Sequence, residues 1–374
     1  MKIKLKIKDN KIKVMCSLIL DTRRLSFKLA KSLIVEKILY EGQKNLVYHA
    51  YDLDEEFLPK LVNYEIDIPG KGEIAIYYQG ELDGGFLYAS NNLFHFSFYN
   101  AWYPIIDNYF DYIVLIEEFN DSWQLLHGIY NEVDNSWSYS PRKTSDSFID
   151  VNIMLLNKKF FSIKKNDDVE FYCQHQYEKI IEDYFSVYNQ IKSFYLDLYK
   201  LNKFEKTSFV YLPKNEGWGG IGYKRANLVV STVPPKKIEE SIILMAHELG
   251  HAYGNGSEVN SFEDWMNETN AEWSALLFLE KQYPDLFDQR IKRHKEIMEG
   301  KTLDLKPNGD KRPDNVHSVG TLIYYKIYEE YGPEMIKEML KIADGLEEKS
   351  TRNFVKALNA SNKKYLSEEI IEHL

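Results

Sequence analysis

Cysteine is scarce in this 374-residue sequence, in which only Cys16 and Cys173 occur. Two cysteines so far apart in the chain form neither a disulfide framework nor a cysteine zinc cluster, and a reducing compartment is the simplest interpretation. No run of 18 apolar residues occurs, so we expect no membrane-spanning helix. Residues 2–8 alternate lysine with apolar residues, unlike the apolar block of a signal peptide. We therefore expect a cytoplasmic protein.

An excess of positive charge is also lacking. Lys and Arg number 47 against 57 Asp and Glu, a net charge of −10, which disfavours binding to nucleic acid. The lysine-rich start is expected to be a solvated strand face, and we expect no membrane partner. With 19 glycines and 11 prolines, the chain is neither collagen-like nor dominated by linkers. A hydrophobic content of 44% and a charged content of 28% are typical of a globular protein. The oligomeric state cannot be inferred from this composition.

Alternation of apolar and polar residues dominates the first part of the chain and predicts β-strands. The clearest case is a hairpin, with runs at 2–8 and 12–20 on either side of a turn at Asp9-Asn10. Further strand-like runs lie at 72–78, 93–99, 111–117 and 148–156. We expect an antiparallel β domain over residues 1–172.

The period changes to that of a helix at about residue 174, which places a domain boundary near Cys173. A long helix is expected over 174–201, followed by strands at 208–212 and 228–232. Further helices are expected after Pro234-Pro235 and at about 267–281, 284–299, 317–331 and 333–343. The fold class is therefore α+β, with a mostly helical second domain at 173–374.

The helix after Pro234-Pro235 contains His247-Glu248-Leu249-Gly250-His251. Its two histidines are four residues apart and project from one face of the helix, so both can bind one metal ion. Imidazole and carboxylate ligands suit Zn²⁺, of which we expect one per chain. Glu248 would then act as the general base on a metal-bound water. The alternative is a structural histidine pair that matches the motif by chance.

A third ligand is expected from the next helix, in which Glu268 and Glu272 are again four residues apart on an otherwise apolar face. Carboxylates on a buried face require cations. We assign Glu268 as the metal ligand and Glu272 as an acceptor that orients a ligand histidine through its second N–H. On a solvated helix the pair would have no such role.

These residues resemble the gluzincin aminopeptidases, a family that includes the alanyl aminopeptidases and leukotriene hydrolase. That family combines the two-histidine helix with a Trp-x-Asn-Glu-x-x-Ala-Glu segment, which matches Trp265 to Glu272. The resemblance implies zinc held by His247, His251 and Glu268, with Glu248 as base. It also implies that residues 1–172 form the β-saddle and 173–374 the thermolysin-like catalytic domain, without a counterpart of the family's large C-terminal helical domain.

The resemblance breaks where the family binds the free amine of its substrate. The family's Gly-Ala-Met-Glu-Asn strand corresponds to Gly219-Gly220-Ile221-Gly222-Tyr223, so the carboxylate is replaced by Gly222. The backbone of Gly219, Gly220 and Ile221 can still pair with an extended peptide substrate. Glu216, or Asn91 and Asn92, are alternative amine anchors. These glycines can instead form only a tight turn between strands.

A second departure concerns the donor to the oxyanion. The family uses a tyrosine in Tyr-x-Lys-Gly, and the matching segment is His317-Ser318-Val319-Gly320. A histidine can donate an N–H to the oxyanion, and we assign His317 this role. Tyr324 and Tyr325 are alternatives, and His317 can instead be structural or solvated.

Together these features predict a zinc metallopeptidase that hydrolyses peptide bonds with metal-activated water. Its fold is aminopeptidase-like, but aminopeptidase and endopeptidase activity both remain open because the amine anchor is absent. The alternative is a non-catalytic peptide-binding or scaffold protein that retains the fold and the metal.

Overall fold

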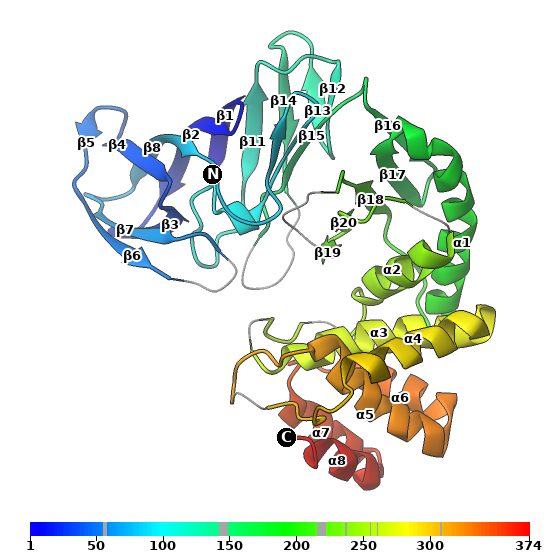
Figure 1. The fold of residues 1–374 in the computed structure, drawn as a ribbon. Helices are drawn as coiled ribbons and strands as arrows, with labels where there is room; N and C mark the ends of the chain where they lie inside the picture. The colour runs from blue at the N-terminus through cyan, green and yellow to red at the C-terminus, as the bar shows by residue number, and fades with distance from the viewer. Residues whose placement is uncertain are drawn as a thin grey trace. The chain divides into compact units, whose positions relative to one another are not determined.

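The computed structural model describes residues 1–54, 58–141, 149–214, 222–235, 238–254, 256–259, 261–306 and 309–374. Contacts between residues divide the chain into two compact units, Met1–Ser162 and Ile163–Leu374, each with its own apolar core (Figure 1). This boundary lies ten residues before the expected one at 172/173, because strand β17 (Val169–Gln174) pairs with strand β18 (Thr207–Tyr211) of the second unit.

The first unit consists of β-strands arranged in an eight-stranded, a four-stranded and a three-stranded sheet within its described residues. The strand order is β13-β14-β11-β1-β2-β8-β4-β5 in the first, β12-β15-β10-β9 in the second and β3-β7-β6 in the third. The strands are β1 (Lys2–Lys8), β2 (Lys11–Leu20), β3 (Arg24–Ala30), β4 (Leu33–Tyr40), β5 (Lys44–Asn45), β6 (Tyr48–Leu53), β7 (Leu61–Asp67), β8 (Gly72–Glu81), β9 (Tyr88–Ser90), β10 (Leu93–Phe96), β11 (Ile113–Glu117), β12 (Trp123–Leu125), β13 (Ile129–Asn131), β14 (Ser136–Tyr139) and β15 (Ile153–Asn157).

The predicted hairpin at the N-terminus is confirmed. Strands β1 and β2 pair antiparallel around Asp9, whose φ of 55° suits a tight turn. Ile3 and Leu5 are buried while the lysines between them are exposed, as the alternation requires. The expectation of an antiparallel domain holds for the hairpins, but β1 pairs parallel with β11. That pairing joins strands about a hundred residues apart, which local alternation does not determine.

The second unit begins with a five-stranded sheet in the order β16-β17-β18-β20-β19. Its remaining strands are β16 (Phe161–Lys165), β19 (Gly222–Arg225) and β20 (Leu228–Ser231). Strands β17, β18 and β20 run parallel, whereas β19 pairs antiparallel with β20 at the edge of the described sheet. Every residue of β18 is buried, as in a parallel strand that is covered on both faces.

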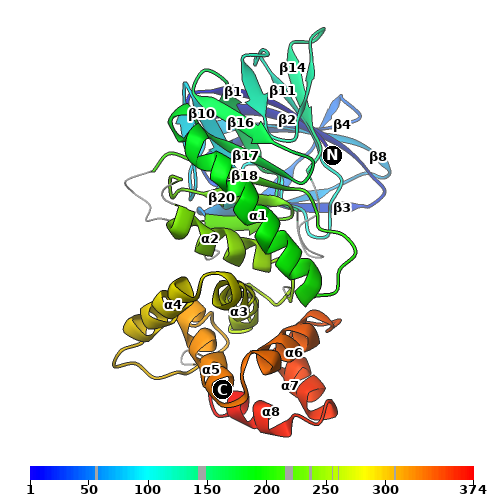
Figure 2. The ribbon, with the colours of Figure 1, turned by 90° about the vertical axis from the view of Figure 1, so that its right-hand side faces the viewer.

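Eight helices of the second unit lie within the described residues, and they are α1 (Glu178–Leu198), α2 (Ile238–Gly250), α3 (Asp264–Gln282), α4 (Pro284–Ile297), α5 (Val316–Tyr331), α6 (Pro333–Asp344), α7 (Thr351–Ala360) and α8 (Lys364–Ile371). Helix α1 contacts strand β17 and lies across the sheet (Figure 2). The helices expected from periodicity are confirmed, with ends shifted by a few residues. Helices α7 and α8 were not predicted, because each is short and a helical period is hard to recognise over so few turns.

None of the helices in the described part of the chain has the length and apolar character needed to cross a bilayer.

Candidate metal centre

Helix α2 carries His247 of the predicted motif in a buried position, and His251 follows directly after its last residue, Gly250, with a partly buried side chain. Ala246 and Leu249 are fully buried in the core, and His247 and Glu248 are only 7% and 5% exposed. The rings of His247 and His251 lie 4.8 Å apart, as expected for side chains one helical turn apart. The C-terminal end of α2 and the residue after it thus bring two imidazoles and a carboxylate close together.

Two glycines allow the helices around this region to approach closely. A Cβ at Gly250 would lie 2.7 Å from the carbonyl oxygen of Ala271, so only glycine permits this packing of α2 against α3. A Cβ at Gly320 would lie 1.9 Å from Oγ1 of Thr269, which applies the same constraint to α5 and α3. Helix α3 is therefore held against both neighbours, and its Glu268 meets their histidines.

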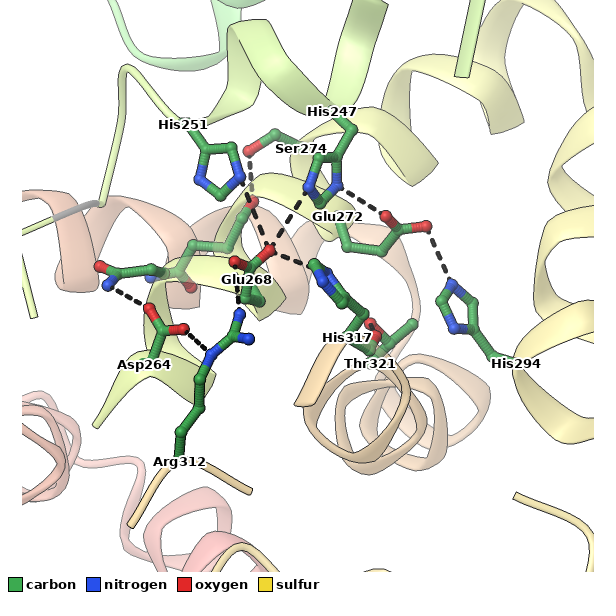
Figure 3. Close-up of polar contacts among 12 residues, drawn as sticks. His247, His251, Asp264, Glu268, Glu272, Ser274, His294, Arg312, His317 and Thr321 are labelled. Carbon is green, nitrogen blue, oxygen red and sulfur yellow. Dashed lines mark hydrogen bonds and ion pairs between the residues drawn. The ribbon is translucent and has the colours of Figure 1, made fainter. Parts of the chain in front are cut away.

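Glu268 Oε2 lies among three imidazole rings (Figure 3). It is 3.5 Å from Nε2 of His247, 3.6 Å from Nε2 of His251 and 2.8 Å from Nδ1 of His317. This buried oxygen makes no well-aligned hydrogen bond. Ligands about 2.1 Å from a tetrahedral ion lie about 3.4 Å from each other, and the distances to His247 and His251 match that separation.

The distance of 2.8 Å from Glu268 Oε2 to His317 Nδ1 is a close polar contact, shorter than the separation of two ligands on one ion. His247, His251 and Glu268 could therefore hold a metal ion together. A fourth position would remain for water, as catalytic zinc sites require.

The other oxygen of Glu268 is held by an arginine from the loop before α5. Arg312 Nη2 donates to Glu268 Oε1 over 3.2 Å, and its Nε donates to Asp264 Oδ2 over 2.5 Å. With Oε1 engaged, Oε2 is the oxygen that faces the histidines. Burial would raise the pKa of Glu268, but the charges of His317 and His251 and the hydrogen bond from His247 hold it well below its usual value.

Glu272, one turn further along α3, is fully buried and carries several hydrogen bonds. Its Oε2 lies 2.7 Å from Nδ1 of His247, while Nε and Nη2 of Arg290 donate to Oε1 and Oε2 over 2.6 and 3.0 Å. Nε2 of His294 lies 2.9 Å from Oε1 (Figure 3). Nδ1 of the same ring lies 2.9 Å from Oγ of Ser318.

Burial would raise the pKa of Glu272, but Arg290 and the two histidines hold it well below the usual value. Glu272 is therefore an anionic acceptor for His247, which orients the ring so that Nε2 faces Glu268. The same contacts act on His247 itself. Burial would lower the pKa of His247, but hydrogen bonds to Glu268 and Glu272 raise it to about 10.

Glu248 differs from Glu272, whose two oxygens both accept hydrogen bonds. Oε2 of Glu248 is buried and unpaired among the described residues. Burial raises the pKa of Glu248, only partly offset by the charge of His247. A buried carboxylate with a free oxygen and a raised pKa is suited to accept a proton from a nearby water.

The structure also locates the remaining predicted residues. His317, at the start of α5, has a half-exposed side chain beside Glu268. Tyr324 is buried near the rings of Trp265 and Trp273, while Tyr325 stacks with Tyr328; neither shares a described contact with Glu268.

The expected peptide-binding residues Gly219, Gly220 and Ile221, and the alternative anchor Glu216, lie outside the described residues. Asn91 and Asn92 form the turn between β9 and β10 in the first unit.

Sequence reasoning missed three residues that contact the two carboxylates. Arg290 and His294 lie on the same stripe of α4 as the buried Phe287 and Ile291, and polar residues within an apolar stripe were an available signal. Arg312 lies in a loop, where no periodicity indicates its partner.

No family model and no curated protein matches the chain. Solved structures do match. An M1 zinc metallopeptidase of Deinococcus radiodurans, a mutant bound to a Tyr-Ser-Ala substrate, aligns with a TM-score of 0.64 at 12% identity, covering 98% of this chain and 91% of that one. Leukotriene A4 hydrolase from Saccharomyces cerevisiae aligns with a TM-score of 0.67 at 12% identity, covering 98% of this chain and 65% of that one. The chain therefore has the fold of the M1 zinc metallopeptidases, a gluzincin fold.

Proposed function

We propose that this chain is a zinc metallopeptidase in which His247, His251 and Glu268 bind one zinc ion. The observation that carries the proposal is the position of Glu268 Oε2, which is buried near two imidazole nitrogens at ligand-to-ligand distances without an aligned hydrogen bond. Zinc bound there would activate a water molecule and polarise a peptide carbonyl. The similarity in fold to peptidases adds support at the level of architecture.

The residues around the ligands can supply proton transfer and charge stabilisation. Glu248 accepts the proton of the attacking water at its unpaired Oε2 and passes it to the amide nitrogen that leaves. His317 directs Nδ1 to Glu268, and as an imidazolium, with an N–H on each ring nitrogen, it would also donate from Nε2 to the developing oxyanion. Glu272 and Arg312 keep His247 and Glu268 in their orientations.

The test combines metal analysis with turnover. Wild-type protein should contain about one zinc per chain, and His247→Ala and Glu268→Ala should lose it. Glu248→Gln should keep the zinc, because Glu248 is not a ligand, and should lower kcat on peptides by roughly 10² to 10⁴. Full zinc content in both ligand variants, or undiminished turnover by metal-replete Glu248→Gln, would contradict the proposal.

A second candidate, a non-catalytic metal-binding or scaffold protein, is favoured by one observation. Atoms of His247, Glu268 and His317 lie within 4.8 Å of one another, and His317 as a further ligand would close the site to water. The zinc affinity of His317→Ala distinguishes the two functions. A loss as large as that of His251→Ala would favour the closed site, whereas near-normal affinity with lowered kcat would favour the peptidase.

The proposed compartment is the cytoplasm. Cys16 and Cys173 are both free and fully buried, which is compatible with a reducing environment.

A further inference from the structure

The edge strand β19 lies beside the proposed general base. Among the described strands it pairs only with β20, so its other edge can pair with an extended peptide. A Cβ at Gly222 would lie 3.2 Å from Glu248 Oε1 and 3.5 Å from Leu244 Cδ1. The start of β19 is therefore in direct contact with α2 at Glu248.

This contact leaves little room for a side chain at Gly222, because the neighbouring atoms would have to move to admit one. A carboxylate there would lie against the carboxylate of Glu248, and both would repel each other in a buried region. The strand therefore offers no anionic group at this position to bind a substrate ammonium.

The next side chain on the same face of β19 carries the opposite charge. Side chains alternate along a strand, so Lys224 projects on the same face as Gly222, toward α2. Lys224 is partly buried and makes no ion pair at contact distance with a described carboxylate. Burial lowers the pKa of Lys224, and the negative charges of Glu248 and Glu205 oppose that shift.

A peptide paired with β19 would bring its own side chains to these positions. Residues directly opposite on neighbouring strands share a face, with Cβ atoms about 5 Å apart. The peptide residue opposite Gly222 would lie beside Glu248, where the bond is cleaved. The residue two positions along the peptide would lie opposite Lys224, whose partly buried ammonium group lacks a contact partner.

We propose that Lys224 binds a carboxylate of the substrate. This chain would then select peptides with an acidic residue two positions from the peptide residue that lies beside Glu248. It would not require a free N-terminus on the peptide. The inference rests on the proposed peptidase function and adds its substrate class. It assigns Lys224 as a specificity-determining residue.

The experiment scans a single Glu, with Gln as the control, through each position of N-acetylated octapeptides. Cleavage by the zinc-loaded protein is followed by mass spectrometry, which also locates the cleaved bond. We expect Glu at one position to raise kcat/KM about tenfold over Gln, the lower range of measured couplings between close charge pairs. Lys224→Met should abolish this preference, Lys224→Arg should retain part of it, and Lys224→Glu should favour Lys in the peptide.

Lys206→Met is the matched control. Lys206 lies next to strand β18 of the same sheet and pairs with Glu170 at 2.9 Å, so this variant removes the same charge away from Glu248. It should keep the preference for Glu. Thermal melting of each variant checks that the fold is intact.

Binding to the metal-free protein, measured by fluorescence anisotropy with the same peptides after labelling, separates this inference from the proposed function. If no peptide is cleaved, peptidase activity is refuted. The role of Lys224 still stands in that case if the Glu peptide binds about tenfold more tightly than the Gln peptide and Lys224→Met removes this difference. If peptides are cleaved with equal Glu-to-Gln ratios by wild type and Lys224→Met, or only with a free N-terminus, the inference is overturned and the peptidase assignment stands.

Discussion

Replacing Glu272 by glutamine should disrupt the network that orients His247. Glutamine keeps the shape of the side chain but removes the charge that pairs with the partly buried Arg290. The substitution also replaces one of the two carboxylate oxygens by an NH₂ group, which cannot accept a hydrogen bond. The oxygen that is lost accepts from Arg290 and from one histidine, His247 at Oε2 or His294 at Oε1. Both changes leave buried polar groups without suitable partners.

The magnitude follows from the burial of these groups. Removing one partner of a buried charge pair costs about 3 to 5 kcal/mol. For a unit of this size, each kcal/mol lowers Tm by about 2 to 4 °C, so Glu272→Gln should melt about 10 °C below the wild type. Loss of the acceptor for a ligand histidine should also weaken zinc binding by about tenfold or more.

The assay is thermal unfolding of the metal-free protein, followed by zinc titration against a chromophoric chelator. Glu280→Gln is the control on the same helix, since Glu280 accepts one hydrogen bond of 2.5 Å from Tyr328 and lies outside the network. It should leave zinc affinity unchanged. Wild-type Tm and zinc affinity in Glu272→Gln would refute the assignment of Glu272 as an anionic, orienting acceptor.

Three further outcomes follow from the same geometry. Hydrogen bonds to carboxylates raise the pKa of His247 to about 10, so zinc must displace a proton from this ring at neutral pH. Titration calorimetry in buffers of different ionisation enthalpy should show about one proton released per zinc bound. Zinc affinity should fall as the pH decreases below about 10. Binding without proton release would contradict this. Arg312→Gln should weaken zinc affinity by about tenfold, since Glu268 Oε1 loses its charged donor, and chelator competition measures this; equal affinity would remove Arg312 from the site. Gly250→Ala should destabilise the fold by about 1 to 3 kcal/mol in urea unfolding, because its Cβ would lie 2.7 Å from the carbonyl oxygen of Ala271; an unchanged midpoint would show that the helices separate without cost.

The metal-free protein should also show the corresponding dependence of stability on pH. The raised pKa of His247 stabilises the fold fully below about pH 6.5, its unfolded value, and this contribution is lost as pH rises toward 10. The depressed pKa of Glu272 contributes stability above about pH 4.3 that is lost as pH falls further. Chemical unfolding between pH 5 and 10 measures the first effect, and a midpoint that rises toward pH 10 would contradict it.

Much of the fold could be predicted because its signals are local. The β1–β2 hairpin depends on alternation and a turn, and helices α3 to α6 depend on a 3.6-residue period. The parallel pairing of β1 with β11 and the inclusion of β17 in the second unit could not be predicted, since each joins segments that are distant in sequence.

The sequence by itself determined which side chains share a helix face. His247 with His251, and Glu268 with Glu272, are each one turn apart, and that relation follows from helix geometry alone. The tertiary structure decided how these faces meet. Close packing of α2 and α5 on α3 brings Glu268 Oε2 among three imidazoles, and α4 brings its arginine and histidine to Glu272. Such contacts depend on packing between helices, which a one-dimensional pattern does not contain.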